Sequence, residues 1–230
     1  MPFIVKNTTF PSLLDLVLPH SCMGCGAIGQ PLCDRCKNNI LKHHENFCPV
    51  CKAKTPSGYC EKCEILPPIF ELSPRSGLIE KLIHSYKYDS TRALARPLAE
   101  MLHEILPPLP KNTVIIPLPT STKHIRERGF DHTLAIAKNL AALRHFSVAT
   151  PLIRAKNTVQ VGADKESRLT QADTAYTVQN GFKANPDTTY LLLDDVWTTG
   201  ASMKSAIKKF LDSGVQKNQF IITLLAAAPD

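Results

Sequence analysis

The chain has 230 residues, of which 43% are hydrophobic and 20% are charged, and its formal net charge is +7. This length fits one large domain, or a medium domain with a small one, and the composition excludes coiled coils, collagen and wholesale disorder. The apolar runs fall far short of the roughly 20 residues of a membrane-spanning helix, and the first residues lack the pattern of a signal peptide. The sequence therefore predicts a cytoplasmic protein without membrane insertion.

Positive charge is concentrated in the middle of the chain. Residues 71–168 contain 15 Lys and Arg against 9 Asp and Glu, whereas residues 169–230 contain 5 against 6. A basic region of this kind is compatible with a phosphate-bearing partner, although an ordinary solvated surface has the same signature.

The first predicted element is a short amphipathic helix over Phe10–Pro19, a leucine-rich segment that ends at Pro19 and has a second proline at its start. Proline is tolerated at the start of a helix but does not continue one. We expect this helix to pack on the segment that follows or on the next domain.

All eight cysteines lie between residues 22 and 63, in four pairs of the form C-x2-C. Each pair places two sulfur atoms on one tight turn, and two such turns form a tetrahedral four-cysteine site, the closed geometry of structural zinc. A disulfide framework is the alternative, but thiols stay reduced in the cytosol. The predicted ligands of two structural Zn²⁺ ions are Cys22, Cys25, Cys33, Cys36, Cys48, Cys51, Cys60 and Cys63.

Two pairings of these turns are compatible with the spacing. Sequential pairing gives the first four cysteines to one ion and the last four to the other, whereas cross-brace pairing alternates the turns. The similar gaps of 7 and 8 residues favour sequential pairing, as in two short ribbons in series. With four cysteines for each ion, nearby histidines are not needed as ligands and are expected to face solvent: His20, His43 and His44.

Helices and short apolar strands alternate after the cysteine-rich segment. Apolar spacing predicts helices over 77–86, 92–106, 134–143 and 202–211, and buried strands over 114–116, 190–193 and 220–227. This alternation predicts an α/β domain with a mostly parallel sheet flanked by helices. The change of composition at Leu66–Phe70 divides the chain into an N-terminal module, residues 1–66, and a second domain, residues 67–230.

The strongest functional signal is the segment Leu191–Met203. A buried strand delivers Asp194 and Asp195 to its carboxyl end, where ligands bind in parallel sheets, and Thr198–Ser202 then turn into a helix. Backbone N–H groups and the helix dipole hold a phosphate at such a turn, whereas paired carboxylates suit vicinal hydroxyls or a cation. The sequence therefore predicts a site for a ribose 5-phosphate, and the segment is not a Walker A loop.

This segment resembles the 5-phosphoribosyl-1-pyrophosphate (PRPP) motif of type I phosphoribosyltransferases, in which apolar residues and two acids precede Thr-Gly-x-Thr/Ser. The resemblance implies that Asp194 and Asp195 are catalytic, since they would hold the ribose hydroxyls and stabilise an oxocarbenium-like centre. It also implies Mg²⁺ bridging the ribose hydroxyls and the pyrophosphate. The implied ligands of the 5-phosphate are Thr198, Thr199, Gly200, Ala201 and Ser202.

The order of the two modules narrows the resemblance. A double zinc-ribbon module in front of a phosphoribosyltransferase domain is similar to the ComF/GntX family, which implies the type I phosphoribosyltransferase fold for the second domain. Asp131 and His132 stand where that family has Asn and Gln, and Gln171 stands where it has Asn. Four further stretches resemble the family pattern: Leu82–Tyr88, Pro117–Pro119, Arg128–Phe130 and Arg154–Tyr176.

Several side chains in these stretches have two interpretations. Lys87 either binds a phosphate of PRPP or caps a helix end, and Arg126 and Arg128 meet either pyrophosphate or a nucleic-acid backbone. His132 is expected to pack at the start of a helix rather than to act as a base. Trp197 either stacks on a base or closes the phosphate loop.

Three functions are compatible with these features. The first is transfer of phosphoribose from PRPP to a small-molecule acceptor, and the second is handling of single-stranded DNA during natural transformation, with PRPP and Mg²⁺ bound and other DNA-uptake proteins as partners. The third is PRPP sensing without catalysis. The family resemblance favours the second. The long polar segment Arg154–Tyr176 is expected to be a lid over the PRPP site, with a disordered insertion as the alternative.

Overall fold

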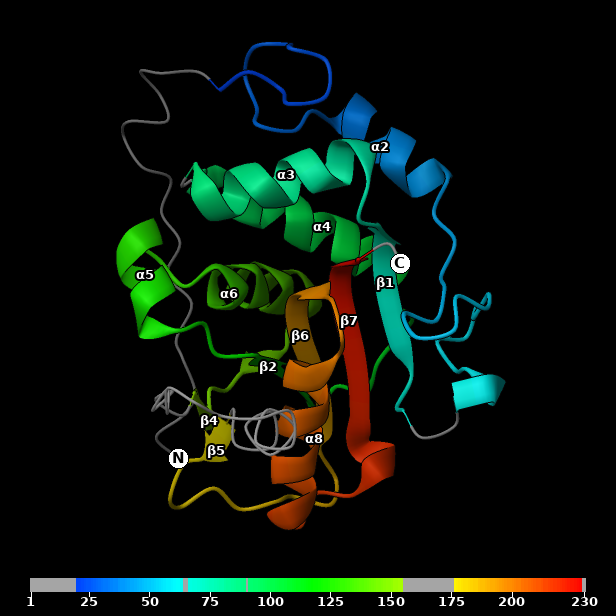
Figure 1. Cartoon of the computed structure of the whole chain (residues 1–230), viewed down its shortest axis with the longest axis vertical. Coiled ribbons are helices and arrows are strands. Elements are labelled where there is room, and N and C mark those ends of the chain that lie inside the picture. The colour runs from blue at the N-terminus through cyan, green and yellow to red at the C-terminus, as the bar shows by residue number, and fades with distance from the viewer. Residues whose placement is uncertain (1–19, 64–65, 90, 155–175, 229–230) are drawn as a thin grey trace, which may run out of the picture.

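The computed structural model describes residues 20–63, 66–89, 91–154 and 176–228 (Figure 1). Its centre is a five-stranded parallel sheet in the order β1-β7-β6-β2-β3. The strands of this sheet are β1 (Ile69–Pro74), β2 (Thr113–Pro117), β3 (Ser147–Val148), β6 (Thr189–Trp197) and β7 (Phe220–Ala227). A separate antiparallel pair consists of β4 (Leu152–Arg154) and β5 (Tyr176–Val178). The predicted helix at 10–19 and the interior of the predicted lid lie outside the described residues.

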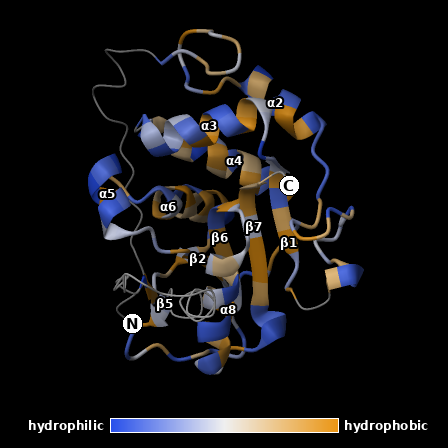
Figure 2. Ribbon diagram, in the orientation of Figure 1, coloured by the Kyte–Doolittle hydropathy of each residue, from blue (hydrophilic) through white to orange (hydrophobic). Residues whose placement is uncertain are grey.

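Helices cover both faces of the sheet, as Figure 1 shows. The face that carries Leu191 and Leu193 packs against α3 (Gly77–Tyr88), α4 (Ala95–Ile105) and α6 (His132–Arg144). The face that carries Leu192 packs against α8 (Ala201–Asp212). Consecutive residues of β6 therefore fill two cores, which is why a strand of a parallel sheet is apolar throughout. Figure 2 shows the resulting hydrophobic strands between helices with hydrophilic outer surfaces.

The shorter helices lie at the periphery. They are α2 (Asp34–Lys42), α5 (Thr122–Arg128) and three 3₁₀ turns at Glu61–Cys63, Arg92–Leu94 and Lys217–Gln219. Every helix within the described ranges is too short or too polar to span a lipid bilayer.

The predicted mixed α/β class with a mostly parallel sheet is confirmed, and each predicted helix and strand after residue 76 corresponds to an observed element. Strand β1 was not predicted, because Glu71 interrupts its apolar run. That carboxylate is buried and accepts a hydrogen bond from the N–H of Ala227 on β7 at 3.1 Å. Burial raises the pKa of Glu71 to about 7, against the opposing effects of that hydrogen bond and of the charge of Lys52.

Strand β6 is longer than predicted. It pairs with β2 from Thr189 to Leu193 but continues beside β7 as far as Trp197. The chain of β2 turns away after the N–H of Leu118 donates to the carbonyl of Leu193. Beyond this point, within the described part of the chain, β6 pairs with β7 alone, and its two acids lie at the carboxyl edge of the sheet.

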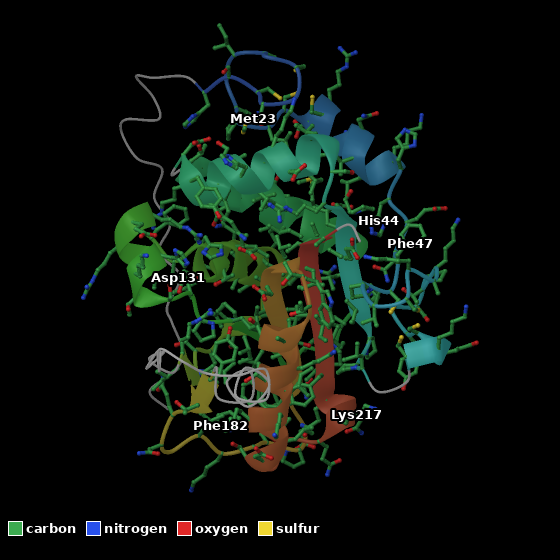
Figure 3. All side chains as sticks on the ribbon, viewed as in Figure 1. Met23, His44, Phe47, Asp131, Phe182 and Lys217 are labelled. Carbon is green, nitrogen blue, oxygen red and sulfur yellow. The ribbon has the colours of Figure 1, made fainter. Side chains whose placement is uncertain are left out.

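The cysteine-rich segment covers the outer edge of β1. Asn46 is buried, and its Nδ2 donates to the carbonyls of Thr55 and Ile69, at 2.8 Å each, while its Oδ1 accepts from the N–H of Glu71 at 2.7 Å. His44, expected to face solvent, is instead partly buried, with its Nε2 3.0 Å from the carbonyl oxygen of Glu71. Figure 3 shows His44 beside β1. The module therefore satisfies backbone groups that an edge strand otherwise presents to other chains.

Replacing Asn46 with Ala should lower the free energy of unfolding by about 1–3 kcal/mol, because buried backbone groups of Ile69 and Glu71 lose their partner. Denaturant unfolding of the zinc-loaded chain, followed by circular dichroism, measures the change. Asn38→Ala on the exposed side of α2 is the matched control and should be neutral or slightly stabilising. Equal stability of the two variants would contradict the role of Asn46.

Candidate functional site

The eight cysteines form two compact clusters. Within each cluster the sulfur atoms all lie within 4.8 Å of one another. The clusters are Cys22, Cys25, Cys33 and Cys36, and Cys48, Cys51, Cys60 and Cys63. This arrangement is sequential pairing and gives two four-cysteine sites of the kind that binds structural zinc.

Backbone N–H groups favour the thiolate at one cysteine of each cluster, whereas burial and the neighbouring sulfur atoms raise the pKa of Cys36 and that of Cys63 to about 12. Burial tends to raise the pKa of Cys22, but N–H groups that include those of Cys33 and Cys25 lower it to about 6. In the second cluster, the N–H of Ala53 is the main cause of a pKa of about 7 for Cys51. The first turn also requires Gly24, since a Cβ there would lie 2.6 Å from the sulfur of Cys36. The close approach of four sulfur atoms in each cluster fits Zn²⁺, whose binding requires and stabilises the thiolate form.

Metal analysis of protein purified without a metal-chelating tag should return about two zinc ions per chain, one for each four-cysteine cluster. Cys25→Ser should reduce the zinc content to about one, because only the first cluster loses a ligand. Ser57→Ala lies in the cysteine-rich segment but outside both clusters and is the control, with unchanged zinc content. A wild-type chain that contains no zinc, with its cysteines in disulfides, would contradict the assignment.

Asp195 of β6 is buried in an ion-pair cluster on the side of α3 and α6. The Nζ of Lys87, near the end of α3, lies 2.7 Å from its Oδ2, and the Nε2 of His132 hydrogen-bonds to the same oxygen. Burial alone would raise the pKa of Asp195, but the hydrogen bond from His132 and the charge of Lys87 outweigh it, so the pKa lies below its ordinary value. Asp195 is therefore an anion held by two helices.

Asp194 has a different environment, because neighbouring residues of a strand point to opposite sides. Its side chain is partly exposed, and the charge of Arg154, at the end of β4, acts on it. Burial and the negative charge of Asp195 raise the pKa of Asp194 above its ordinary value. A cation or hydroxyl donors beside Asp194 would relieve this repulsion, which fits the chemistry expected of the site.

His132 links the acid to a cation. Its Nδ1 lies 2.9 Å from Nη1 of Arg128 and 3.1 Å from Oγ1 of Thr120. Because arginine has only donors, Nδ1 accepts this hydrogen bond, and Nε2 carries the proton that is donated to Asp195. His132 does begin α6, as expected, but its ring connects Arg128 to Asp195 in addition to packing there.

Neighbouring groups hold His132 in place. The hydroxyl of Tyr86 donates to its carbonyl at 2.7 Å, and Asp131 caps α6 by accepting from the N–H of Leu134 at 3.1 Å. Asp131 is labelled in Figure 3, at the turn between α5 and α6. The Asp-His sequence that departs from the family pattern is therefore the helix cap followed by the ring that contacts Asp195.

The turn from β6 into α8 requires a glycine. Gly200 has φ of +73° and is the N-cap of α8, and the N–H of Ala201, the first residue of the helix, donates to Oγ1 of Thr199 at 3.3 Å. A Cβ at this position would lie 2.2 Å from the ring of Trp197, which is buried. Trp197 therefore closes the loop, and its burial argues against stacking on a base. The side chains of Thr198 and Thr199 are exposed, so the amino end of α8 faces solvent.

The predicted site residues are partly brought together. Lys87 contacts Asp195 directly, and Arg128 reaches it through His132, whereas Arg126 is exposed on α5. His132 was not among the predicted binding residues. The sequence feature that could have indicated its role is its position four residues after Arg128, on the other side of the cap of α6.

Comparisons with known proteins agree with this organisation. Residues 13–64 match the family model described as a double zinc ribbon domain. The chain is 23% identical over 211 residues to competence protein ComFC of Bacillus subtilis (strain 168), and the match covers 85% of this chain and 84% of that protein. With the two four-cysteine clusters, these findings confirm the resemblance to the ComF family: the chain is ComF-like and carries an N-terminal double zinc ribbon.

Proposed function

We propose that this ComF-like protein binds PRPP with Mg²⁺ at the carboxyl end of β6 and handles single-stranded DNA during DNA uptake for natural transformation. The observation that carries the proposal is the placement of Asp194 and Asp195 directly before the solvent-facing amino end of α8. The similar Bacillus protein is described as a competence protein, which supports the biological role.

Each part of PRPP has a complementary group in this proposal. Backbone N–H groups of Thr198–Ser202 and the dipole of α8 would hold the 5-phosphate. Asp194 would bind the ribose hydroxyls, because it is the more accessible carboxylate. Lys87 and Arg128 would face the pyrophosphate, and Asp195 would position Lys87 directly and Arg128 through His132. Oxygen donors such as Asp194 suit Mg²⁺, which would neutralise pyrophosphate charge when bound.

The same arrangement is compatible with phosphoribosyl transfer. In that reaction the bond from ribose C1 to the pyrophosphate oxygen breaks, the electron pair leaves with pyrophosphate, and an acceptor forms the new bond to C1 and loses a proton. Asp194 would stabilise the positive charge that develops on the ribose. Release of pyrophosphate from PRPP distinguishes this enzyme, acting on a small-molecule acceptor, from a PRPP sensor without catalysis.

Asp194→Asn should weaken PRPP binding by at least about tenfold, because the carboxylate accepts hydrogen bonds from the ribose hydroxyls and the amide is a poorer acceptor. Isothermal calorimetry with PRPP and Mg²⁺ measures the change, and the circular-dichroism spectrum should stay the same. Asp212→Asn, exposed at the other end of α8, is the control and should bind like the wild type. Unchanged affinity in Asp194→Asn would refute the assigned ribose contact.

Asp195 is not a suitable residue for that test. Its removal would leave the largely buried ammonium group of Lys87 without this partner, and breaking a buried ion pair from one side strongly destabilises proteins. A loss of PRPP binding in such a variant would therefore not distinguish a contact with the ligand from a disturbed site.

The DNA-binding part of the proposal rests on the basic middle of the chain and on α5. Lys123 and Arg126 are both exposed on this helix. Phosphate contacts by such side chains release counterions, so affinity for single-stranded DNA should fall steeply as the salt concentration rises. Lys87 is less suited to this role, since its ammonium group is directed to Asp195.

Arg126→Ala should reduce the slope of log affinity against log salt by roughly 0.7–1, the amount expected for one lost phosphate contact. Fluorescence anisotropy of a labelled oligothymidylate over a series of salt concentrations measures the slope. Lys111→Ala is the control, because Lys111 precedes β2 at the opposite, amino edge of the sheet and is also exposed. If the wild-type chain binds no single-stranded DNA even at low salt, PRPP sensing or small-molecule transfer becomes the better proposal.

A further inference from the structure

Tyr88, the last residue of α3, is 65% exposed although it follows a residue of the acid cluster. The Nζ of Lys87 lies 2.7 Å from Asp195, whereas the ring of Tyr88, the next residue, faces solvent. The exposed ring of Tyr88 therefore lies next in sequence to Lys87, the cation that contacts Asp195.

Two neighbouring side chains hold this ring. The guanidinium carbon of Arg128 lies 5.6 Å from the centre of the Tyr88 ring, within the range of a cation–π contact. The ring of His84, one helical turn earlier, lies 4.9 Å away at 46°. The same guanidinium of Arg128 also contacts His132, which hydrogen-bonds to Asp195. The exposed ring is thus connected to the acid through Arg128 and His132.

Charges of both signs lie near the ring, because the exposed Asp89 follows it and Glu127 of α5 lies 3.9 Å from Lys123, but the cation in contact with the ring is Arg128. Lys81 is exposed on the same side of α3, three residues before His84, and α5 contributes the exposed Lys123 and Arg126. An exposed aromatic ring among cations is the combination by which proteins bind single-stranded nucleic acids: cations follow the backbone and the ring stacks on a base. A single exposed ring has no meaning alone, but here the ring lies against Arg128, a cation that is linked to Asp195 through His132.

We propose that Tyr88, His84 and Arg128 form a stacking platform for a base of single-stranded nucleic acid. This inference rests on the proposed DNA-handling function and deepens it, because it specifies where a base binds. A strand on this platform passes its phosphates over α5 and its stacked base beside the residues that would hold pyrophosphate. The strand and PRPP therefore approach Arg128 from two sides.

The experiment uses the full zinc-loaded chain and a short oligothymidylate with one 2-aminopurine, whose fluorescence is quenched on stacking. Tyr88→Leu removes the aromatic face and keeps an apolar side chain of similar reach. It should weaken binding by roughly 5- to 150-fold, the range for loss of one base–aromatic stack, and reduce the quenching. Because no phosphate contact is lost, the salt dependence should stay as in the wild type. Tyr88→Phe keeps the ring and should retain both affinity and quenching.

Tyr59→Leu is the matched control. Tyr59 is another exposed tyrosine, 51% exposed, and it belongs to the second cysteine cluster segment, which Figure 1 places on the side of the molecule opposite α5. This variant should bind DNA like the wild type and keep its zinc.

Each other outcome overturns the platform in a recognisable way. If the wild type binds the oligonucleotide and Tyr88→Leu shows the same affinity and quenching, the DNA function stands but the stacking platform is wrong. If Tyr88→Leu changes the slope of log affinity against log salt but leaves the quenching as in the wild type, the ring does not stack on a base. Its effect on DNA binding is then exerted through the charge of Arg128. If the wild type binds no single-stranded DNA, the DNA function and the platform both fail, whereas PRPP binding is tested separately through Asp194.

Discussion

The buried carboxylate of Asp195 is the group on which the arrangement of the site depends. A buried anion costs several kcal/mol unless it is paired and hydrogen-bonded. Here Lys87 from α3 and His132 from α6 both bind its Oδ2, so two helices are tied to one strand end. Since His132 donates to Asp195 through Nε2, its Nδ1 accepts from Arg128. One negative charge thus orients two cations around the carboxyl edge of the sheet.

The two adjacent acids consequently have different tasks. Asp195 has its partners within the protein, whereas Asp194 is partly exposed and lies next to an anion that raises its pKa. A motif with two acids suggests a symmetric clamp for two hydroxyls, but alternation along the strand separates them. In this structure the carboxylate that is available to a ligand is Asp194, and Asp195 determines where the surrounding cations lie.

Local patterns in the sequence predicted the helices and strands that have continuous or periodic apolar residues. They also predicted the metal sites whose ligands are close together in the sequence. Cysteine spacing identified both clusters, and apolar runs identified β6 and β7. The contact of His132 with Asp195 joins residues 63 positions apart, and no local pattern encodes it. The same holds for β1, where the buried Glu71 breaks the apolar run and finds its partner on β7. The burial of Trp197 depends on the missing side chain of Gly200, which becomes visible only once the turn is folded.

The double zinc ribbon is more than an attached module, because its hydrogen bonds cross the predicted boundary at residue 66. Gly58 accepts from the N–H of Ile69 at 2.9 Å, and Asn46 satisfies further groups on the outer edge of β1. An uncovered edge strand is a template for pairing with other chains. Asn46 and Gly58 each lie two residues before a cysteine of the second cluster, β1 pairs with β7, and β7 pairs with β6. A zinc ion that fixes the second cluster would therefore also stabilise the covered edge of the sheet whose central strand carries Asp194 and Asp195.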